Sequence, residues 1–190
     1  MNRSQLEHII RAASGVANVE ELIVIGSQSI LGQFPHAPPS LTLSIEADVY
    51  PKFKPEDSIV IDGAIGELSI FHQSHGYYAH GVGADTAVLP RGWEERLVAI
   101  KNENTHGATG WCLEAHDLAA SKLVAGREKD HKFVANLFRY RMISSDLLMA
   151  RVEAIDFPDD SLKKITLDRL GSIINTVDIL PLPEIEIVGQ

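Results

Sequence analysis

The order of apolar and polar positions along the chain predicts one sheet flanked by helices. Glu21–Ile25 is a run of consecutive apolar residues that stops at Gly26, as in a strand buried on both faces. In Leu41–Tyr50, by contrast, acidic and apolar residues alternate before Pro51 ends the run. The predicted strands are 21–25, 41–50, 77–82, 96–101 and 111–114, the last two joined as a hairpin by the turn-forming stretch 102–110.

Apolar residues at helical spacing predict the rest of the regular structure. Gln5–Ala13 has this spacing, with Ser4 as its expected N-cap, and Asp117–Tyr140 is the longest such pattern. Further helices are expected at 27–31, within 55–68, and at 145–155 and 160–174, while the proline-containing tail from Leu180 is expected to be extended. The resulting fold class is α+β, with a mixed sheet, packed helices and a helical C-terminal part. Residues 1–143 are expected to form the main domain, and 144–190 a helical extension of the same compact unit.

Composition narrows the class of protein. The formal net charge is −9 at pH 7, with 26 acidic and 17 basic residues, which argues against a broad basic face for duplex nucleic acid. No segment approaches the roughly 18 consecutive apolar residues of a membrane span, and the mixed N-terminus does not resemble a secretory signal. The lone Cys112 cannot form an internal disulfide. We therefore expect a cytoplasmic protein without a membrane partner.

A Gly-Ser pair follows the first predicted strand. Glycine lets a ligand approach the backbone closely, and free N–H groups at a helix start favour an anion such as phosphate. Ser27 adds a hydroxyl donor next to Gly26. Gly-Ser is also a common turn dipeptide, so a purely structural turn is the alternative.

Two carboxylates lie two residues apart on the second predicted strand. Glu46 and Asp48 share one face, whereas Ile45, Ala47 and Val49 take the other. Adjacent carboxylates repel each other, and Mg²⁺ is the natural compensating group because it takes oxygen ligands and substrate phosphates. The alternative is a solvated face of an edge strand.

The two motifs occur together in a known order. The stretch Val24-Ile25-Gly26-Ser27-Gln28, followed by Glu46-Ala47-Asp48-Val49-Tyr50, resembles the signature of the DNA polymerase β-like nucleotidyltransferases. The later run from Leu113 to Asp130 is similar to the lysine and arginine-aspartate motifs of abortive-infection nucleotidyltransferase toxins. The resemblance covers roughly residues 20 to 140, and uncharacterised bacterial nucleotidyltransferase-like proteins are the nearest group.

This resemblance implies the nucleotidyltransferase fold and transfer of a nucleotidyl group from a nucleoside triphosphate to RNA or protein. On this interpretation Gly26 and Ser27 hold the triphosphate, Glu46 and Asp48 hold Mg²⁺ or Mn²⁺, and Lys122 contacts the triphosphate as a catalytic cation. A toxin of a toxin–antitoxin or phage-defence system is the implied setting. Its partners would be a tRNA end or protein acceptor and an antitoxin protein.

The sequence departs from the family pattern at two points. The first metal position is Glu46, where the family more often has Asp, and the expected third carboxylate is missing from the strand that carries His80. His80 could accept a proton instead, since histidine is a common general base near neutral pH. Other candidates are Asp62, Glu67, Asp85 and Glu114. Two alternatives therefore stay open: a degenerate protein that binds a nucleotide or partner without catalysis, and a metal-dependent hydrolase using the same acids.

Arg127 is the remaining candidate for the triphosphate. On a continuous helix it would lie about 140° from Lys122, so both reach one site only if the helix breaks at Gly126. Otherwise Arg127 would pair with Asp130 on the surface. The basic residues that could guide an RNA end to the site are Lys122, Arg127, Lys129, Lys132, Arg139 and Arg141. Their density favours RNA slightly over a protein acceptor.

Overall fold

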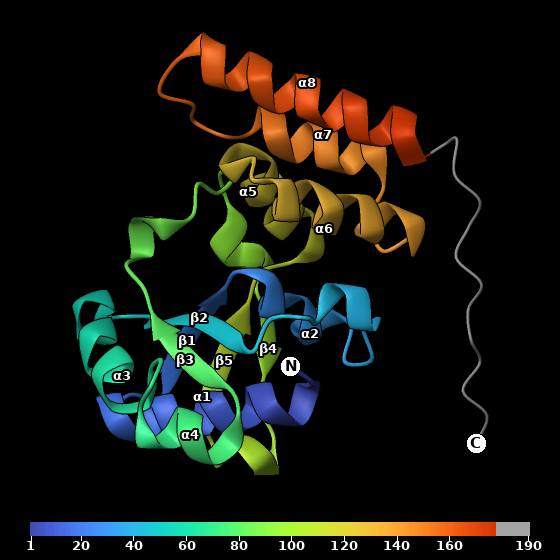
Figure 1. Ribbon diagram of the computed structural model, residues 1–190. Coiled ribbons are helices and arrows are strands. Elements are labelled where there is room, and N and C mark those ends of the chain that lie inside the picture. The colour runs from blue at the N-terminus through green and yellow to red at the C-terminus, as the bar shows by residue number, and fades with distance from the viewer. Residues whose placement is uncertain (178–190) are drawn as a thin grey trace, which may run out of the picture.

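A five-stranded mixed sheet forms the centre of the protein, and a computed structural model describes residues 1–177 (Figure 1). The order is β3-β2-β1-β5-β4. The central strand β1 is antiparallel to β2 and parallel to β5, β2 is parallel to β3, and β4 and β5 form the expected hairpin. The strands are β1 (Glu21–Ile25), β2 (Glu46–Pro51), β3 (Tyr78–Gly81), β4 (Val98–Ile100) and β5 (Thr109–Cys112).

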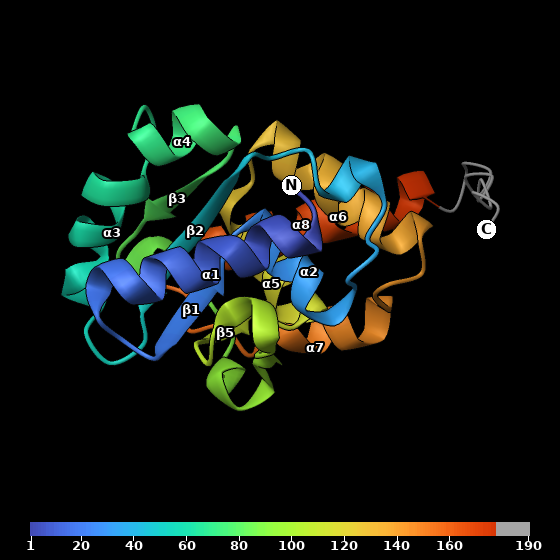
Figure 2. The same cartoon turned by 90° about the horizontal axis from the view of Figure 1, so that it is seen from below.

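The helices cover the two sides of this sheet. Helix α1 (Arg3–Ala17) crosses one side, near α3 and α4, and α5 to α8 are stacked on the opposite side (Figures 1 and 2). The remaining helices are α2 (Ile30–Gln33), α3 (Ser58–Ile65), α4 (Ile70–His75), α5 (Ala115–Ala125), α6 (Glu128–Arg139), α7 (Ser145–Glu153) and α8 (Asp160–Val177). The α+β class predicted from the sequence is confirmed. Within residues 1–177, no helix has both the length and the apolar character needed to cross a membrane.

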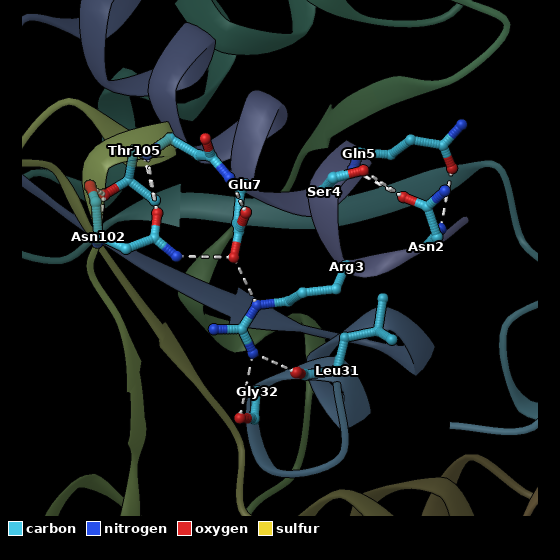
Figure 3. A network of polar contacts seen from close by, with 10 residues as sticks. Asn2, Arg3, Ser4, Gln5, Glu7, Leu31, Gly32, Asn102 and Thr105 are labelled. Atoms are coloured by element: carbon cyan, nitrogen blue, oxygen red, sulfur yellow. Dashed lines mark hydrogen bonds and ion pairs between the residues drawn. The ribbon is translucent and has the colours of Figure 1, made fainter. Parts of the chain in front are cut away.

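Helix α1 follows its predicted apolar pattern but begins earlier than expected. Asn2, not Ser4, is the N-cap, because its side chain accepts from the Gln5 backbone and Gln5 reaches back to the Asn2 N–H. This reciprocal capping box satisfies two N–H groups at once (Figure 3). Burial of Leu6 and Ile10, among others, then fixes the helix against the sheet.

A buried carboxylate ties α1 to the loop after β4. Glu7 is only 5% exposed and accepts from Arg3 at 2.9 Å and from Asn102 at 2.8 Å (Figure 3). Arg3 also donates to the Leu31 and Gly32 carbonyls at the end of α2. Burial alone would raise the pKa of Glu7, but the Asn104, Asn102 and Arg3 hydrogen bonds outweigh it and lower that pKa. The charged network therefore fixes the end of the segment that follows β1.

The structure differs from the predicted elements in two further places. The second strand begins at Glu46, because Pro39–Leu41 forms a 3₁₀ turn and no strand covers residues 42–45. The stretch containing His72 and His75, which lies between two predicted elements, is helix α4, capped by Ser69 at its start. The tail from Leu180 lies outside the described residues.

The long predicted helix divides in two at Gly126. This residue has φ 65° and ψ 21°, a left-handed conformation that glycine adopts without steric cost, and its N–H bonds the Lys122 carbonyl. Arg169 of α8 donates to the Leu123 and Val124 carbonyls, which the broken helix would otherwise leave unpaired. Helices α5 and α6 thus meet at a defined corner.

We expect Gly126→Ala to destabilise the protein by roughly 1–2 kcal/mol or more, because alanine pays a penalty at positive φ. The added Cβ would also lie 2.0 Å from Cζ of Arg169. Urea denaturation measures this change in the free energy of unfolding.

Gly171→Ala is the matched control, because Gly171 lies inside α8 with no heavy atom within 4 Å of an added Cβ. That variant should be stabilised by up to about 1 kcal/mol. Equal effects of the two substitutions would contradict the assigned corner.

Candidate functional site

The Gly26–Ser27 turn lies directly beside the second strand. Ile25 pairs with Asp48 in the antiparallel ladder, so Gly26 follows where the two strands separate. Gly26 has φ 68°, and a Cβ at this position would lie 2.0 Å from Oδ2 of Asp48. Its carbonyl accepts from the backbone and hydroxyl of Ser29, which closes a 3₁₀ turn before the short α2. Glycine is therefore required both by the backbone conformation and by the neighbouring carboxylate.

The two predicted acids point to the same face of β2, as their spacing indicates. Strand β3 runs parallel beside them and places Tyr78 opposite Glu46 and His80 opposite Asp48. The Tyr78 hydroxyl donates to Oε2 of Glu46 at 2.9 Å, and Nδ1 of His80 lies 3.0 Å from Oδ1 of Asp48. Each carboxylate thus has one oxygen held by β3.

The electrostatics of this pair favour a bound cation. Burial raises the pKa of Asp48, and the negative charge of Glu46 raises it further, while His80 only partly offsets both effects. Burial and the Glu46 carboxylate likewise raise the pKa of Tyr78 to about 12, which keeps its hydroxyl a proton donor. A Mg²⁺ or Mn²⁺ ion would relieve the repulsion between the carboxylates, and carboxylate oxygens suit such an ion. The residues present therefore fit a divalent metal.

Protein ligands alone would not complete such a site. In the described part of the chain, no group of three or more His, Cys, Asp or Glu residues is arranged to hold a metal ion. Two carboxylates with substrate phosphates and water filling the other positions is a common arrangement for Mg²⁺.

Two cations from the α5–α6 corner meet on one buried carboxylate. Lys122 Nζ lies 3.0 Å from Oδ1 of Asp130, and Arg127 Nε lies 2.6 Å from its Oδ2. The break at Gly126 allows Lys122 and Arg127 to reach the same site. It is the break that the sequence analysis required for both residues to do so. The pairing of Arg127 with Asp130 is real, but the expectation that it lies on the surface is wrong, because the Asp130 side chain is 0% exposed.

The three charged groups of this cluster differ in how deeply they are buried and in how their pKa values shift. Burial would raise the pKa of Asp130, but the hydrogen bonds and charges of Arg127 and Lys122 outweigh it, so its pKa is lowered. Burial lowers the pKa of Lys122, although Asp130 opposes the shift. The ammonium also lies 4.7 Å from the centre of the Phe133 ring. Arg127 is 61% exposed, so part of its guanidinium stays open to a ligand while its Nε pairs with Asp130.

A single cavity of about 380 Å³ brings the predicted residues together. Its lining residues are Gly26, Ser27, Glu46, Asp48, His80, Thr86, Lys122, Ala125, Arg127 and Lys129. All six candidates named from the sequence are therefore neighbours: the turn, the two acids and the two cations. The carboxylates come from β2 and the cations from α5 and the α5–α6 corner, and a metal-bound polyphosphate requires both kinds of group.

The four other acids considered for the missing third carboxylate, called here the reserve carboxylates, lie outside the cavity. None of Asp62, Glu67, Asp85 and Glu114 lines this cavity. Asp62 accepts from the Gly81 N–H at 3.3 Å, and Glu114 caps the start of α5. Among the titratable residues considered as a third group, His80 is the one that the structure brings to the acids.

Two residues that hold the site together were not predicted from the sequence. Tyr78 was seen only as part of a strand, and its contact with Glu46 depends on the parallel register of β2 and β3. Asp130 was treated as a surface residue because it stands in a run of alternating charges. The sequence signal for this contact is the spacing of Lys122 and Asp130, which are eight residues apart with Gly126 between them.

Comparison with known families agrees with this geometry. Residues 4–171 match the model of a family described as "Nucleotidyltransferase of unknown function (DUF6036)". Neither a curated protein nor a solved structure matches the chain. The family match covers most of the chain, including every residue of the cavity, and so the protein belongs to this family of nucleotidyltransferases.

Proposed function

We propose that the protein transfers a nucleotidyl group from a nucleoside triphosphate to a hydroxyl or terminal phosphate of an RNA end or a protein. One observation carries the proposal. The Gly26–Ser27 turn, the acids Glu46 and Asp48, and the cations of the α5–α6 corner line the same cavity. This combination suits a polyphosphate with a divalent metal better than it suits a neutral or cationic ligand.

Each group has a role in this proposal. The Gly26 backbone and the Ser27 hydroxyl bind phosphate oxygens, and Glu46 and Asp48 would hold Mg²⁺ or Mn²⁺. When bound, the metal supplies positive charge against the triphosphate. Lys122 and Arg127 add fixed positive charge from the opposite wall. His80 lines the cavity, and histidine is a common general base, so we assign the proton acceptor to it.

The second candidate function is nucleotide binding without turnover. It is favoured by the location of the four reserve carboxylates outside the cavity, which leaves His80 as the proton acceptor. Incubation with radiolabelled triphosphates, Mg²⁺ and total tRNA distinguishes the two. Transfer of label supports the enzyme, and saturable binding without any transfer supports the binding protein.

A biological setting follows from the resemblance of residues 113–130 to abortive-infection toxins. We propose that the protein acts as the toxin of a toxin–antitoxin or phage-defence pair. A gene for a small antitoxin-like protein beside its own would support this role, and an unrelated metabolic operon would argue against it.

Asp48→Asn should weaken metal-dependent binding of a non-hydrolysable nucleoside triphosphate at least tenfold, because the amide is a poorer metal ligand than the carboxylate. Isothermal titration calorimetry with and without Mg²⁺ measures the effect. Since burial already disfavours the Asp48 charge, the variant should remain folded.

Asp156→Asn provides the control for Asp48→Asn. It makes the same change of charge at an acid whose side chain is 76% exposed and paired with Arg91. Metal-dependent binding in Asp48→Asn equal to that in Asp156→Asn would exclude Asp48 from the site.

Gly26→Ala should reduce nucleotide affinity more than Ser27→Ala does. The alanine Cβ must displace the Asp48 carboxylate, whereas the serine change removes a single hydroxyl donor worth about 1 kcal/mol. Titration of both variants, with circular dichroism as a check of folding, makes the comparison. If the folded Gly26→Ala variant binds as tightly as the parent, the turn does not contact phosphate.

If the acceptor is an RNA end, its binding should depend only moderately on salt. Of the six basic residues named above, Lys122 and Arg127 pair with Asp130, and Lys132 pairs with Glu128. With about three phosphates neutralised, affinity for tRNA should fall roughly twentyfold between about 50 and 200 mM salt.

The measurement is a labelling assay over a salt series, with tRNA and a purified partner protein as competing acceptors. Label that enters the protein acceptor and never tRNA would overturn the RNA assignment.

A further inference from the structure

A second cavity, of about 470 Å³, adjoins the first. It lies between α6 and the segment that leads into β2. Its walls include Ser40, Leu41, Leu43, Ser44, Phe133 and Asn136. Four further lining residues, Ser27, Glu46, Lys122 and Lys129, also line the cavity described above. The two cavities therefore meet at the phosphate turn and the buried lysine.

The chemistry of the second cavity differs from that of the first. Leu41, Leu43 and Phe133 supply apolar walls, which the first cavity lacks. Leu43 is 79% exposed, so an aromatic ligand placed against it would remove apolar surface from water. Phe133 and Asn136 are three residues apart on α6 and so lie on the same face of that helix. An apolar cleft with a few polar groups is typical of a small-molecule site of this size.

We infer that this second cavity holds the nucleobase and ribose of the donor nucleotide, with Asn136 reading the edge of the base. The inference rests on the proposed function and adds the subsite that selects the nucleotide. The Asn136 amide both donates and accepts hydrogen bonds, as the edge of every base requires. Ser40 and Ser44 also line this cavity, and their hydroxyls can form hydrogen bonds with the hydroxyls of a ribose.

The position of the shared residues assigns the cavity to the donor. Ser27 and Lys122 line both cavities, so a ligand whose phosphates lie between them can extend into either one. One leads to Asp48, His80 and Arg127, where charged groups suit a polyphosphate. The other leads to Leu43 and Asn136, where apolar walls suit a base. Lys122 over the Phe133 ring marks the boundary between them.

The experiment compares nucleoside triphosphates with inorganic tripolyphosphate, each titrated with Mg²⁺ by calorimetry. The parent protein should bind its preferred nucleotide at least tenfold more tightly than tripolyphosphate. Asn136→Ala should lower the affinity for that nucleotide about tenfold, and Leu43→Ala about threefold. Neither change should alter the affinity for tripolyphosphate, whereas Ser27→Ala should weaken both ligands.

Two exposed positions outside the cavity serve as matched controls. Asn175→Ala removes an exposed amide from α8, and Leu68→Ala shortens a leucine that is 77% exposed. Both should bind nucleotide and tripolyphosphate as the parent does. Effects of the same size in these variants would show that Asn136 and Leu43 act through general stability, which would overturn the subsite.

Other outcomes separate this inference from the proposed function. Equal affinity of the parent for nucleotides and tripolyphosphate would overturn the base subsite and leave the phosphate site intact. Failure of both ligands to bind would overturn the proposed function and the subsite with it. If Asn136→Ala lowers the affinity for a short RNA oligonucleotide but not for the nucleotide, the cavity binds the acceptor and the donor assignment is wrong.

Discussion

The buried carboxylate of Asp130 is the constraint on which the cationic half of the site depends. An ionised carboxylate without exposed surface is costly unless it is paired and hydrogen-bonded. Lys122 from the last turns of α5 and Arg127 from the α5–α6 corner satisfy it together. Because the two cations come from different elements, the pairing also fixes the angle at which α6 leaves α5. Removing either cation would leave Asp130 under-compensated in the interior.

The acidic half is fixed by a different principle, the register of the sheet. Parallel pairing of β2 with β3 holds Glu46 through Tyr78 and Asp48 through His80. Antiparallel pairing of β2 with β1 brings Asp48 to Gly26. Three strands thus position two carboxylates against the Gly26–Ser27 turn. Helical contacts position the opposing cations, so the two halves can be perturbed separately by mutation.

The sequence predicted what depends on local pattern and missed what depends on pairing. Strand β1, the acids of β2 and the glycine break needed only periodicity and the conformational preference of glycine. Tyr78 could not be assigned to Glu46 without knowing which strand lies next to β2. Asp130 was judged from its charged neighbours in the chain, yet its burial arises from packing of α6 against α5. The late start of the second strand, at Glu46 instead of Leu41, reflects the prolines before Leu41, which favour a 3₁₀ turn.

On the proposed function, helix α6 links phosphate binding to base selection. Asp130 anchors its first turn, Phe133 supports the Lys122 ammonium one turn later, and Asn136 follows on the same face. Fixing Asp130 also fixes the positions of Phe133 and Asn136, because the helical backbone holds residues three apart at a constant spacing. The residue proposed to read the base is therefore placed by the same carboxylate that places the phosphate-binding cations. On the proposed function, α6 therefore orients the residue that reads the base relative to Lys122 and Arg127, while β2 and the Gly26–Ser27 turn position the rest of the phosphate site.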